Sequence, residues 1–388
     1  MKIEIVNSIT DIKEQDWRRL NSTSSVFSNY QFFKCLESSG SVSKAQGWQP
    51  HHLQLTSDTQ EKNTTEIDAI VPMYIKSHSW GEYVFDWVWA DAYQHHNVPY
   101  YPKLVATAPF TPVTGDKLLS QKLKINELFP YLSEHCQQSN MNSWHLLYCQ
   151  TEEQREQQAS VLTTENVYQR NTVQFHWLNY DYRDFNDFLA NFTARKRKNT
   201  RKERLSIEQQ DINIRRIKGA EINKKELAFF YLTYQLTYLK RGHTPHLTLQ
   251  FFQDIIKQLP ENVLLIIANC KGEDVACAWF FYDNDNLYGR YWGCTQNFNN
   301  LHFELCYYQG IEFCIENKLS LFHPGTQGEH KIQRGFEPKL TTSYHWIKHQ
   351  AFRPSIKAFC LQEQQQMYHY QKQCQQLLPF RQSQTNDK

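Results

Sequence analysis

The pattern of apolar and polar positions is clearest in the second half of the chain, where strand-like and helix-like segments follow a regular order. The predicted order is strand, two helices, three strands, helix and strand, over residues 213–217, 224–239, 248–258, 263–269, 275–282, 287–292, 300–318 and 319–322. Polar turns rich in Asn, Asp and Gly separate the three central strands. Such turns predict an antiparallel meander.

The first half shows weaker signals of the same kind. Strands and helices are expected to alternate over residues 2–6, 12–19, 51–55, 67–75, 104–108, 126–138 and 143–149. At 388 residues the chain is long enough for two domains. We therefore expect an α/β (α+β) protein with mixed sheets in two domains, 1–175 and 176–388, each holding a sheet of its own. The second domain should include a long helix over 184–209 and a peripheral, Gln-rich C-terminal helix.

Composition excludes several functions. Lys plus Arg number 42 and Asp plus Glu 40, so a polyanion must be bound by a local patch and not by the surface as a whole. The 13 glycines form neither G-x-G-x-x-G nor G-x-x-x-x-G-K-[ST], which excludes a Walker-type hydrolase and a standard dinucleotide fold. The ten cysteines contain no C-x-x-C and predict reduced core thiols in a cytoplasmic protein. No apolar run approaches the roughly 20 residues of a membrane span, and the N-terminus does not resemble a signal peptide.

Four segments carry a resemblance to a known family. They are residues 81–87 (GEYVFDW), 100–103 (YYPK), 109–115 (PFTPVTG) and 325–336 (GTQGEHKIQRGF). They resemble the signature blocks of a bacterial family described as peptidoglycan biosynthesis/recognition, and the likeness covers nearly the whole chain. The element order over 213–322 also resembles the acyl-CoA N-acyltransferase (GNAT) fold. A tandem pair of such domains resembles the Fem transferases, which add amino acids to peptidoglycan precursors from aminoacyl-tRNA.

The resemblance implies a tandem GNAT-like N-acyltransferase. One departure weighs against coenzyme A as the donor: the R/Q-x-x-G-x-G/A loop of the acyl-CoA enzymes is absent from residues 293–300, which read GCTQNFNN.

The most basic segment is 195–204, with seven basic residues and one acidic residue in ten. Its basic side chains point to every side of a helix, so the segment cannot bury an apolar face. We expect it to bind phosphates of a tRNA acceptor stem, a lipid-linked precursor or a CoA tail; the alternative is a solvated helix end that contacts acidic groups. The candidate phosphate-binding residues are Arg195, Lys196, Arg197, Arg201, Lys202 and Arg204, together with Asn300 at the N-terminus of a later helix.

The resemblance to the GNAT fold implies that the segment 287–293 is the strand at which the sheet splays. A bulge there would expose a backbone N–H to the ester or thioester oxygen, and Gly289 and Gly293 suit such a bend. A Tyr is a reasonable general acid for a departing thiolate or ribose hydroxyl, so Tyr291 is a catalytic candidate. The substrate-binding candidates on this strand are Tyr288, Arg290 and Trp292. Ordinary aromatic core packing is the alternative for each aromatic residue.

The loop over 325–336 places four ionisable groups at the end of a strand, where ligands commonly bind. Glu329 or His330 is expected to deprotonate the attacking amine. Lys331 and Arg334, with Gln327, are expected to bind a carboxylate or phosphate of the substrate. A structural ion-pair turn is the competing interpretation.

In the first domain, Glu82 and Asp86 lie among aromatic residues and are candidates for binding an amine or a sugar. Packing beneath a long loop is the alternative. The histidine pairs offer no third ligand at metal spacing, so no metal is expected.

These observations predict a cytoplasmic N-acyltransferase that transfers an acyl or aminoacyl group to an amine by direct attack. Acyl-CoA is slightly preferred as the donor because the overall charge is near neutral, and tRNA is the alternative. The contrasting hypothesis is an inactive GNAT-fold protein that binds a peptidoglycan precursor or sugar.

Overall fold

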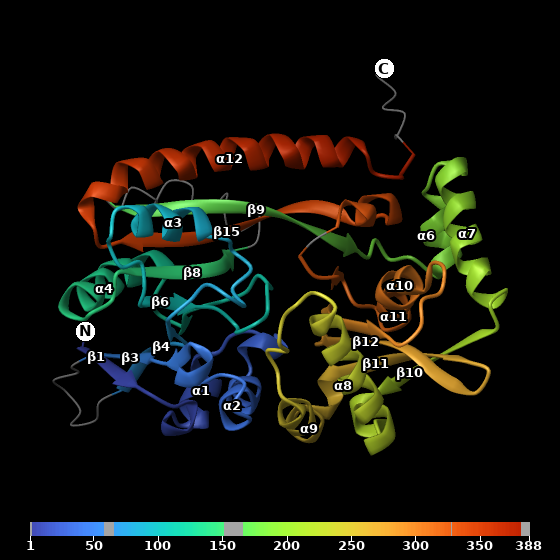
Figure 1. Cartoon of the computed structure of the whole chain (residues 1–388), viewed down its shortest axis with the longest axis horizontal. Coiled ribbons are helices and arrows are strands. Elements are labelled where there is room, and N and C mark those ends of the chain that lie inside the picture. Colours follow the sequence, from blue (N-terminus) through green and yellow to red (C-terminus); the bar gives the residue numbers. More distant parts are fainter. Residues whose placement is uncertain (1, 58–65, 151–165, 327, 382–388) are drawn as a thin grey trace. The chain divides into compact units, whose positions relative to one another are not determined.

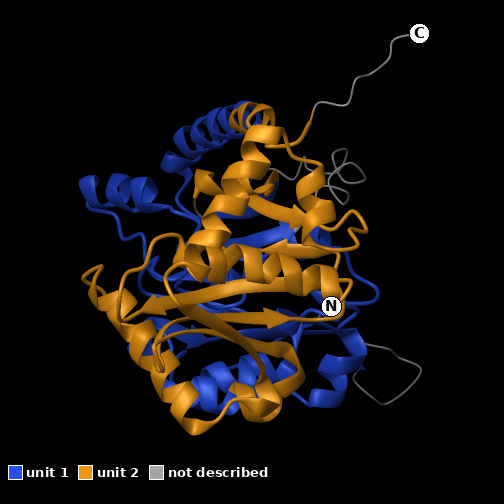
Figure 2. Ribbon diagram, turned by 90° about the vertical axis from the view of Figure 1, so that its right-hand side faces the viewer, with its two compact units in different colours: residues 1–173, 246–254, 340–369 blue, residues 174–245, 255–339, 370–388 orange. Residues whose placement is uncertain are grey.

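The computed structural model describes residues 2–57, 66–150, 166–326 and 328–381 (Figure 1). The chain divides into two compact units, coloured separately in Figure 2. Unit 1 comprises residues 1–173, 246–254 and 340–369, and unit 2 comprises residues 174–245, 255–339 and 370–388. Unit 1 therefore includes the first part of α9 (Leu249–Gln258) and most of β15 (Glu337–Ile347) and α12 (Arg353–Gln376).

Unit 1 is built on two groups of strands. Its strands include β1 (Lys2–Val6), β2 (Trp48–Pro50), β3 (His52–Ser57), β4 (Glu66–Val71), β5 (Tyr74–Lys76), β6 (Lys103–Ala106), β7 (Leu119–Ser120) and β8 (Ser143–Gln150). Its helices include α1 (Glu14–Leu20), α2 (Tyr30–Ser38), α3 (Trp87–His95) and α4 (Ile125–Gln138). The first group is a four-stranded sheet in the order β1-β3-β4-β7. In the second group β6 runs parallel to β8 and antiparallel to β5.

The core of unit 1 joins these two groups. Leu55 and Val71 of the four-stranded sheet pack in one cluster with Leu104 of β6, Trp144 of β8 and Leu128 of α4, and all five are fully buried. Burial of such side chains contributes roughly 1.5–3 kcal/mol each, so this cluster fixes β6 and β8 firmly against the four-stranded sheet.

Unit 2 contains the element series that the sequence predicts, apart from the second helix, α9, of which only residues 255–258 belong to this unit. Its helices and strands are α6 (Phe185–Ala190), α7 (Ala194–Glu208), β10 (Ile212–Lys218), α8 (Lys224–Leu239), β11 (Val263–Cys270), β12 (Glu273–Tyr282), β13 (Asn286–Cys294), α10 (Leu301–Phe303), α11 (Gln309–Glu316) and β14 (Leu321–His323). Strands β10 to β13 pair antiparallel in sequence order, which confirms the predicted meander. Helix α8 packs on β12 and β13, and α11 packs on β13 and β14.

A long strand, β9 (Val167–Leu178), changes the predicted sheet arrangement. The hydrogen-bonded order is β10-β11-β12-β13-β14-β9-β15-β8-β6-β5-β2, a single run of eleven strands. The expectation of a separate sheet in each half is therefore wrong, because β9 and β15 each continue across the boundary between the units. Polar residues interrupt the apolar pattern of β9, and they are satisfied by tertiary contacts: the Asn171 amide donates to Thr341 and Thr342.

Two helices also differ from their predictions. The single helix expected over 184–209 is divided into α6 and α7, because Phe192 forms a β-bridge with Phe380 and the N–H of Thr193 donates to the Pro379 carbonyl. The helix expected over 300–318 spans 301–316 and contains a π turn, η6 (Glu304–Tyr308). Helix α3 lies in the aromatic stretch 80–101, where a dense run of Trp and Tyr hides the helical period.

Candidate functional site

The sheet of unit 2 opens between β13 and β14. These strands pair in parallel over residues 286–288 and 321–323. Beyond Tyr288, β13 continues to Cys294, whereas β14 ends at His323. Among the described strands, none pairs with this edge of β13 beyond Tyr288. The backbone of this part of β13 therefore bonds to groups other than a neighbouring strand on that side, and the Thr237 hydroxyl of α8 donates to the Trp292 carbonyl at 2.8 Å.

A β-bulge at Arg290 lies at this opening. Tyr291 and Gly289 are opposite adjacent residues of β12, so Arg290 is the extra residue. A Cβ built on Gly289 would lie 3.5 Å from the Cα of Pro324, and one on Gly325 would lie 3.8 Å from the Gly289 carbonyl oxygen. The loop that follows β14 therefore approaches the bulge closely.

Tyr288, a predicted substrate-binding residue, belongs to the core. Its hydroxyl donates to Asp283 Oδ2 at 2.7 Å, and its ring stacks on His323 with centroids 5.1 Å apart. The side chain is 3% exposed. This arrangement matches the core-packing alternative for Tyr288.

Tyr291, Trp292 and Arg290 are half-buried on the part of β13 beyond the split. The Tyr291 ring lies 5.1 Å from that of Tyr234 on α8, and Arg290 lies 5.5 Å from the Tyr291 ring. The Trp292 ring lies 5.2 Å from the His302 ring of α10. The bulge thus separates a core residue from residues near the opening.

Lys331 is the most deeply buried ionisable residue of the 325–336 loop among the described residues. It belongs to a 3-10 helix, η7 (Glu329–Arg334), and is 2% exposed. Its Nζ donates to the Gly325 carbonyl at 2.7 Å. Burial lowers the pKa of Lys331 to about 7. No ion pair joins this amine to a carboxylate within the described residues, and the opposing effect of the nearby Cys306 thiol is smaller than that of burial.

Two imidazoles and a phenol lie beside Lys331. His330 is exposed, and its Nε2 lies 2.8 Å from the Tyr307 hydroxyl. The His302 ring lies 5.4 Å from the ring of Tyr307 and 6.2 Å from that of His330. Burial lowers the pKa of His302 to about 4 and also lowers the pKa of His330; Lys331 and Arg334 act in the same direction. Both imidazoles are therefore predominantly neutral at pH 7 and able to accept a proton.

The π turn η6 supplies part of this cluster. Both Tyr307 and Cys306 lie within it, and Cys306 is close enough to Lys331 for the thiol and the amine to influence each other. Burial raises the pKa of the Cys306 thiol. π turns within α-helices frequently occur at functional sites.

The other candidates in the 325–336 loop contact the protein itself. Arg334 is 7% exposed and donates to both carboxylate oxygens of Glu203 at 2.9 Å. Glu329 is exposed and accepts a hydrogen bond from the Tyr370 hydroxyl at 2.7 Å. Gln327 lies outside the described residues. Arg334 therefore forms an ion pair within the protein, as the structural alternative predicts. Lys331 and His330 form no such pair within the described residues.

The basic residues of α7 fall into two classes. Arg195, Lys198, Arg201 and Lys202 are exposed, and Lys196 and Arg197 are half-buried. Within the described residues none of these six forms an ion pair, although Arg197 reaches the carbonyls of Ala190 and Phe192 at 3.5 Å. Arg204 differs, since it donates to Glu304 at 2.8 Å and to Glu312 at 2.5 Å.

Asn300 precedes α10 with a φ of 63° but does not cap that helix with its side chain. Its amide donates to Ser206 of α7 at 2.9 Å. Asn300 thus connects α7 to the start of the next helix.

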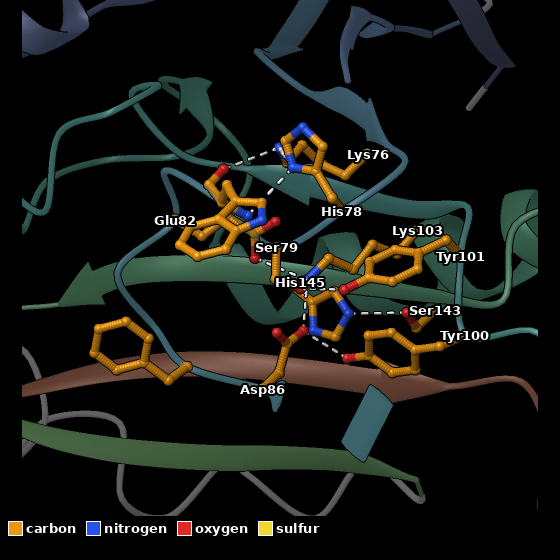
Figure 3. A network of polar contacts seen from close by, with 12 residues as sticks. Lys76, His78, Ser79, Glu82, Asp86, Tyr100, Tyr101, Lys103, Ser143 and His145 are labelled. Atoms are coloured by element: carbon orange, nitrogen blue, oxygen red, sulfur yellow. Dashed lines mark hydrogen bonds and ion pairs between the residues drawn. The ribbon is translucent and has the colours of Figure 1, made fainter. Parts of the chain in front are cut away.

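Glu82 and Asp86 lie in a buried network of unit 1 (Figure 3). Lys103 Nζ donates to Ser79 Oγ at 2.8 Å, to Glu82 Oε2 at 2.8 Å and to Asp86 Oδ2 at 2.5 Å. The Tyr100 hydroxyl donates to the same oxygen of Asp86 at 2.6 Å. The network ties residues 79–86 to β6. This supports the packing alternative, and a ligand role for the two acids stays a prediction.

Two lysines explain why two acids are buried here. Lys76 of β5 is directly opposite Lys103 of β6, and both are fully buried. Burial lowers the pKa of Lys76 to about 7 and raises that of Glu82 to about 7. Lys103 holds the pKa of Asp86 well below its usual range in spite of burial. The acids therefore compensate lysines that the sheet has removed from water.

Neither a metal site nor a membrane-spanning helix emerges from the part of the chain that the structure describes. No group of three His, Cys, Asp or Glu residues is arranged there to hold an ion. None of its helices is both long and apolar enough to cross a bilayer.

Comparisons with known proteins agree with this architecture. A family model described as peptidoglycan biosynthesis/recognition, FemAB-like, matches residues 8–382. No curated protein matches the chain. The crystal structure of FemX is similar, with 11% identity over 91% of this chain and 100% of that chain and a TM-score of 0.50. A conserved protein of unknown function from Bacteroides thetaiotaomicron VPI-5482 gives 10% identity over 89% and 100% of the two chains, and a TM-score of 0.52.

A tandem GNAT protein from the clavulanic acid biosynthesis pathway has 8% identity over 89% of this chain and 98% of that chain, with a TM-score of 0.43. The predicted fold class, α/β with mixed sheets of the Fem type, is confirmed by the FemX likeness and the family match.

Several members of the unit 2 cluster were not predicted from the sequence. His302, Cys306 and Tyr307 lie in the helix expected over 300–318, where Asn300 was the one candidate site residue. One sequence signal was present, because aromatic residues, His and Cys crowd into 302–308. The low pKa of Lys331 had no such signal, because it depends on burial.

Proposed function

Because the chain belongs to the FemAB-like family described as peptidoglycan biosynthesis/recognition, we propose that it is an N-acyltransferase acting on an amine of a peptidoglycan precursor. The observation that carries the proposal is Lys331, a buried amine with a lowered pKa beside the place where β13 separates from β14. Perturbed ionisable groups next to an opening in the fold are typical of catalytic sites.

The geometry supports direct acyl transfer. The acceptor amine attacks the carbonyl carbon of the donor, and a C–N bond forms as the C–O or C–S bond to the carrier breaks. The attacking nitrogen releases one proton, and the leaving oxygen or sulfur takes one up. With a pKa of about 7, Lys331 is neutral in about half of the molecules at pH 7 and can accept the first proton and return it to the leaving group.

Other groups at the site fit supporting roles. The hydrogen-bonded pair of His330 and Tyr307 offers a second path for the proton. The backbone N–H groups of β13 beyond Tyr288 are candidates to bind the carbonyl oxygen as negative charge develops on it. Tyr291 and Trp292 are candidates to contact the acyl group, since both remain half-buried at this part of the strand.

The donor is an acyl-CoA or an aminoacyl-tRNA. Acyl-CoA is the donor that the GNAT resemblance favours. The six basic residues of α7 without ion pairs among the described residues favour a donor with many phosphates, which is tRNA. A salt series on donor binding separates the two, because each neutralised phosphate adds roughly 0.7–0.9 to the slope of log affinity against log salt.

The salt experiment compares the wild type with a variant in which Arg197, Arg201 and Lys202 are changed to Ala. Arg204 is left intact because it is bound by two glutamates. The matched control changes three exposed lysines elsewhere in unit 2, Lys224, Lys225 and Lys257. A steep slope that the first variant alone flattens supports tRNA. A shallow slope that neither variant alters supports acyl-CoA.

The activity test incubates the full chain with panels of acyl-CoAs, aminoacyl-tRNAs and muropeptide precursors and detects the amide product by mass spectrometry. Lys331→Met should reduce product formation by about 100-fold or more, the range for loss of a general acid–base group. Lys257→Met, at an exposed site of unit 2, should leave it unchanged. If no combination yields product but a precursor raises the melting temperature, the protein is the binding protein of the alternative hypothesis.

A further inference from the structure

The one acidic residue of the basic segment 195–204 is turned into the protein. Glu203 is 27% exposed, and both of its carboxylate oxygens lie 2.9 Å from Nη2 of Arg334. The Tyr308 hydroxyl donates to the same carboxylate. A negative charge on a phosphate-binding helix weakens anion binding. Its place opposite Arg334 therefore points to a different role.

Arg334 connects Glu203 to the reactive loop. Its Nη1 donates to the His330 carbonyl at 2.7 Å, and its guanidinium lies 3.5 Å above the ring of Phe303. The His330 carbonyl is part of the peptide unit whose nitrogen belongs to Lys331. A continuous path of hydrogen bonds thus runs from α7 to the backbone that carries His330 and Lys331.

The neighbouring residue anchors α7 a second time. Arg204 donates to Glu304 of the π turn and to Glu312 of α11. Glu203 and Arg204 together fix the end of α7 to the two elements that supply the candidate site, while the preceding basic residues stay available to phosphates. The helix is therefore held rigidly at one end and open to a ligand at the other.

We propose that Glu203 is a positioning residue that couples α7 to the loop carrying His330 and Lys331. The inference rests on the proposed function, because it takes α7 as the helix that binds donor phosphates. Without the carboxylate, the buried guanidinium of Arg334 has lost its counter-charge and moves toward water, releasing the His330 carbonyl. The loop then loses its fixed position, while phosphate binding on α7 is kept or slightly strengthened.

The first test needs no enzymatic activity. Hydrogen exchange of the full chain is measured with and without inorganic polyphosphate, which stands in for the donor phosphates. In Glu203→Gln, amides in 328–336 should exchange about tenfold faster, the effect of losing a hydrogen bond to a charged group. Polyphosphate should protect these amides in the wild type but not in the variant. Glu208→Gln, at an exposed position on the same helix, is the matched control and should behave as the wild type.

Two results would overturn the coupling. One is unchanged exchange at 328–336 in Glu203→Gln, and the other is an equal change in the Glu208→Gln control. If Glu203→Gln fails to fold, Arg334→Lys replaces it, since lysine keeps the charge but cannot bridge Glu203 and the His330 carbonyl in the same way. That variant is expected to give the same faster exchange, and wild-type exchange in it would equally refute the proposal.

A kinetic test follows if transfer activity is found. Glu203→Gln should lower kcat by about tenfold with donor KM unchanged, because the site is misplaced while the phosphates are still bound. A rise in KM with kcat unchanged would instead place Glu203 in donor binding and contradict positioning. Absence of any transfer activity, with the exchange result intact, would refute the proposed function and leave the coupling supported.

Discussion

Acidification from pH 7 to pH 5 should destabilise unit 2 through a buried pair of histidines. His323 Nδ1 lies 3.1 Å from His176 Nε2, so the two rings share one hydrogen bond. His176 is also 3.2 Å from Gln174, and His323 stacks on Tyr288. Lys331 and Lys339 act on His176, and both oppose its protonation. The pair therefore has no nearby counter-ion for an added proton among these groups.

The magnitude follows from the difference between folded and unfolded pKa values. Burial lowers the pKa of His323 to about 3 from 6.5, and it also takes the pKa of His176 well below 6.5. At pH 5 the unfolded imidazoles bind protons and the folded ones do not. Stability is therefore lost as pH falls below the unfolded value of 6.5, by about 2 kcal/mol at pH 5 for His323 alone. His176 shifts in the same direction and adds to that loss, which is already a substantial part of a typical domain's 5–15 kcal/mol.

The assay is urea unfolding at pH 7 and pH 5 for the wild type and for His323→Asn. The variant has one titrating group fewer, so its loss of stability between the two pH values should be about 2 kcal/mol smaller. His243→Asn, at an exposed position in unit 2, serves as control and should lose as much as the wild type. If His323→Asn loses as much stability as the wild type, the buried pair does not titrate as the structure requires.

Three further predictions follow from other contacts. Lys103→Met should lower the free energy of unfolding measured in urea by about 3–5 kcal/mol, because it leaves the buried carboxylates of Glu82 and Asp86 without their counter-charge. Adding Glu82→Gln should recover part of that loss, and no recovery would contradict this account. The transfer rate should have a pH limb near 7 that disappears in Lys331→Arg, since arginine keeps its charge; persistence of the limb would assign it to another group. Gly293→Ala should lower the melting temperature markedly, because its Cβ would lie 2.2 Å from the Thr233 carbonyl oxygen; an unchanged melting temperature would contradict this packing.

Much of unit 2 was determined by local sequence patterns. The meander of β11, β12 and β13 is predicted because each strand is a short apolar run bounded by a polar turn, and neighbouring strands then pair by default. Gly289 and Gly293 predict a bend in this strand. The four motif blocks identify the family because they are long and contiguous, and the family match over 8–382 agrees with them.

The chemical state of each candidate residue was decided by tertiary structure. Lys331 and Arg334 look alike in the sequence, yet burial without an acid lowers the pKa of Lys331, while Glu203, 131 residues away in the chain, binds Arg334. Glu82 and Asp86 look like surface ligands among aromatic residues, but they compensate lysines that strand pairing has buried.

Long-range pairing also explains the errors in the predicted elements. Helix α6 stops before α7 because Phe192 pairs with Phe380, and β9 is a strand although polar residues interrupt its pattern. Local sequence patterns reflect which side chains of a segment are buried or exposed and how the segment interacts with residues close to it in the sequence. The pKa of an amine, the partner of a guanidinium and the end of a helix depend on groups that only folding brings near, so these properties had to come from the tertiary structure.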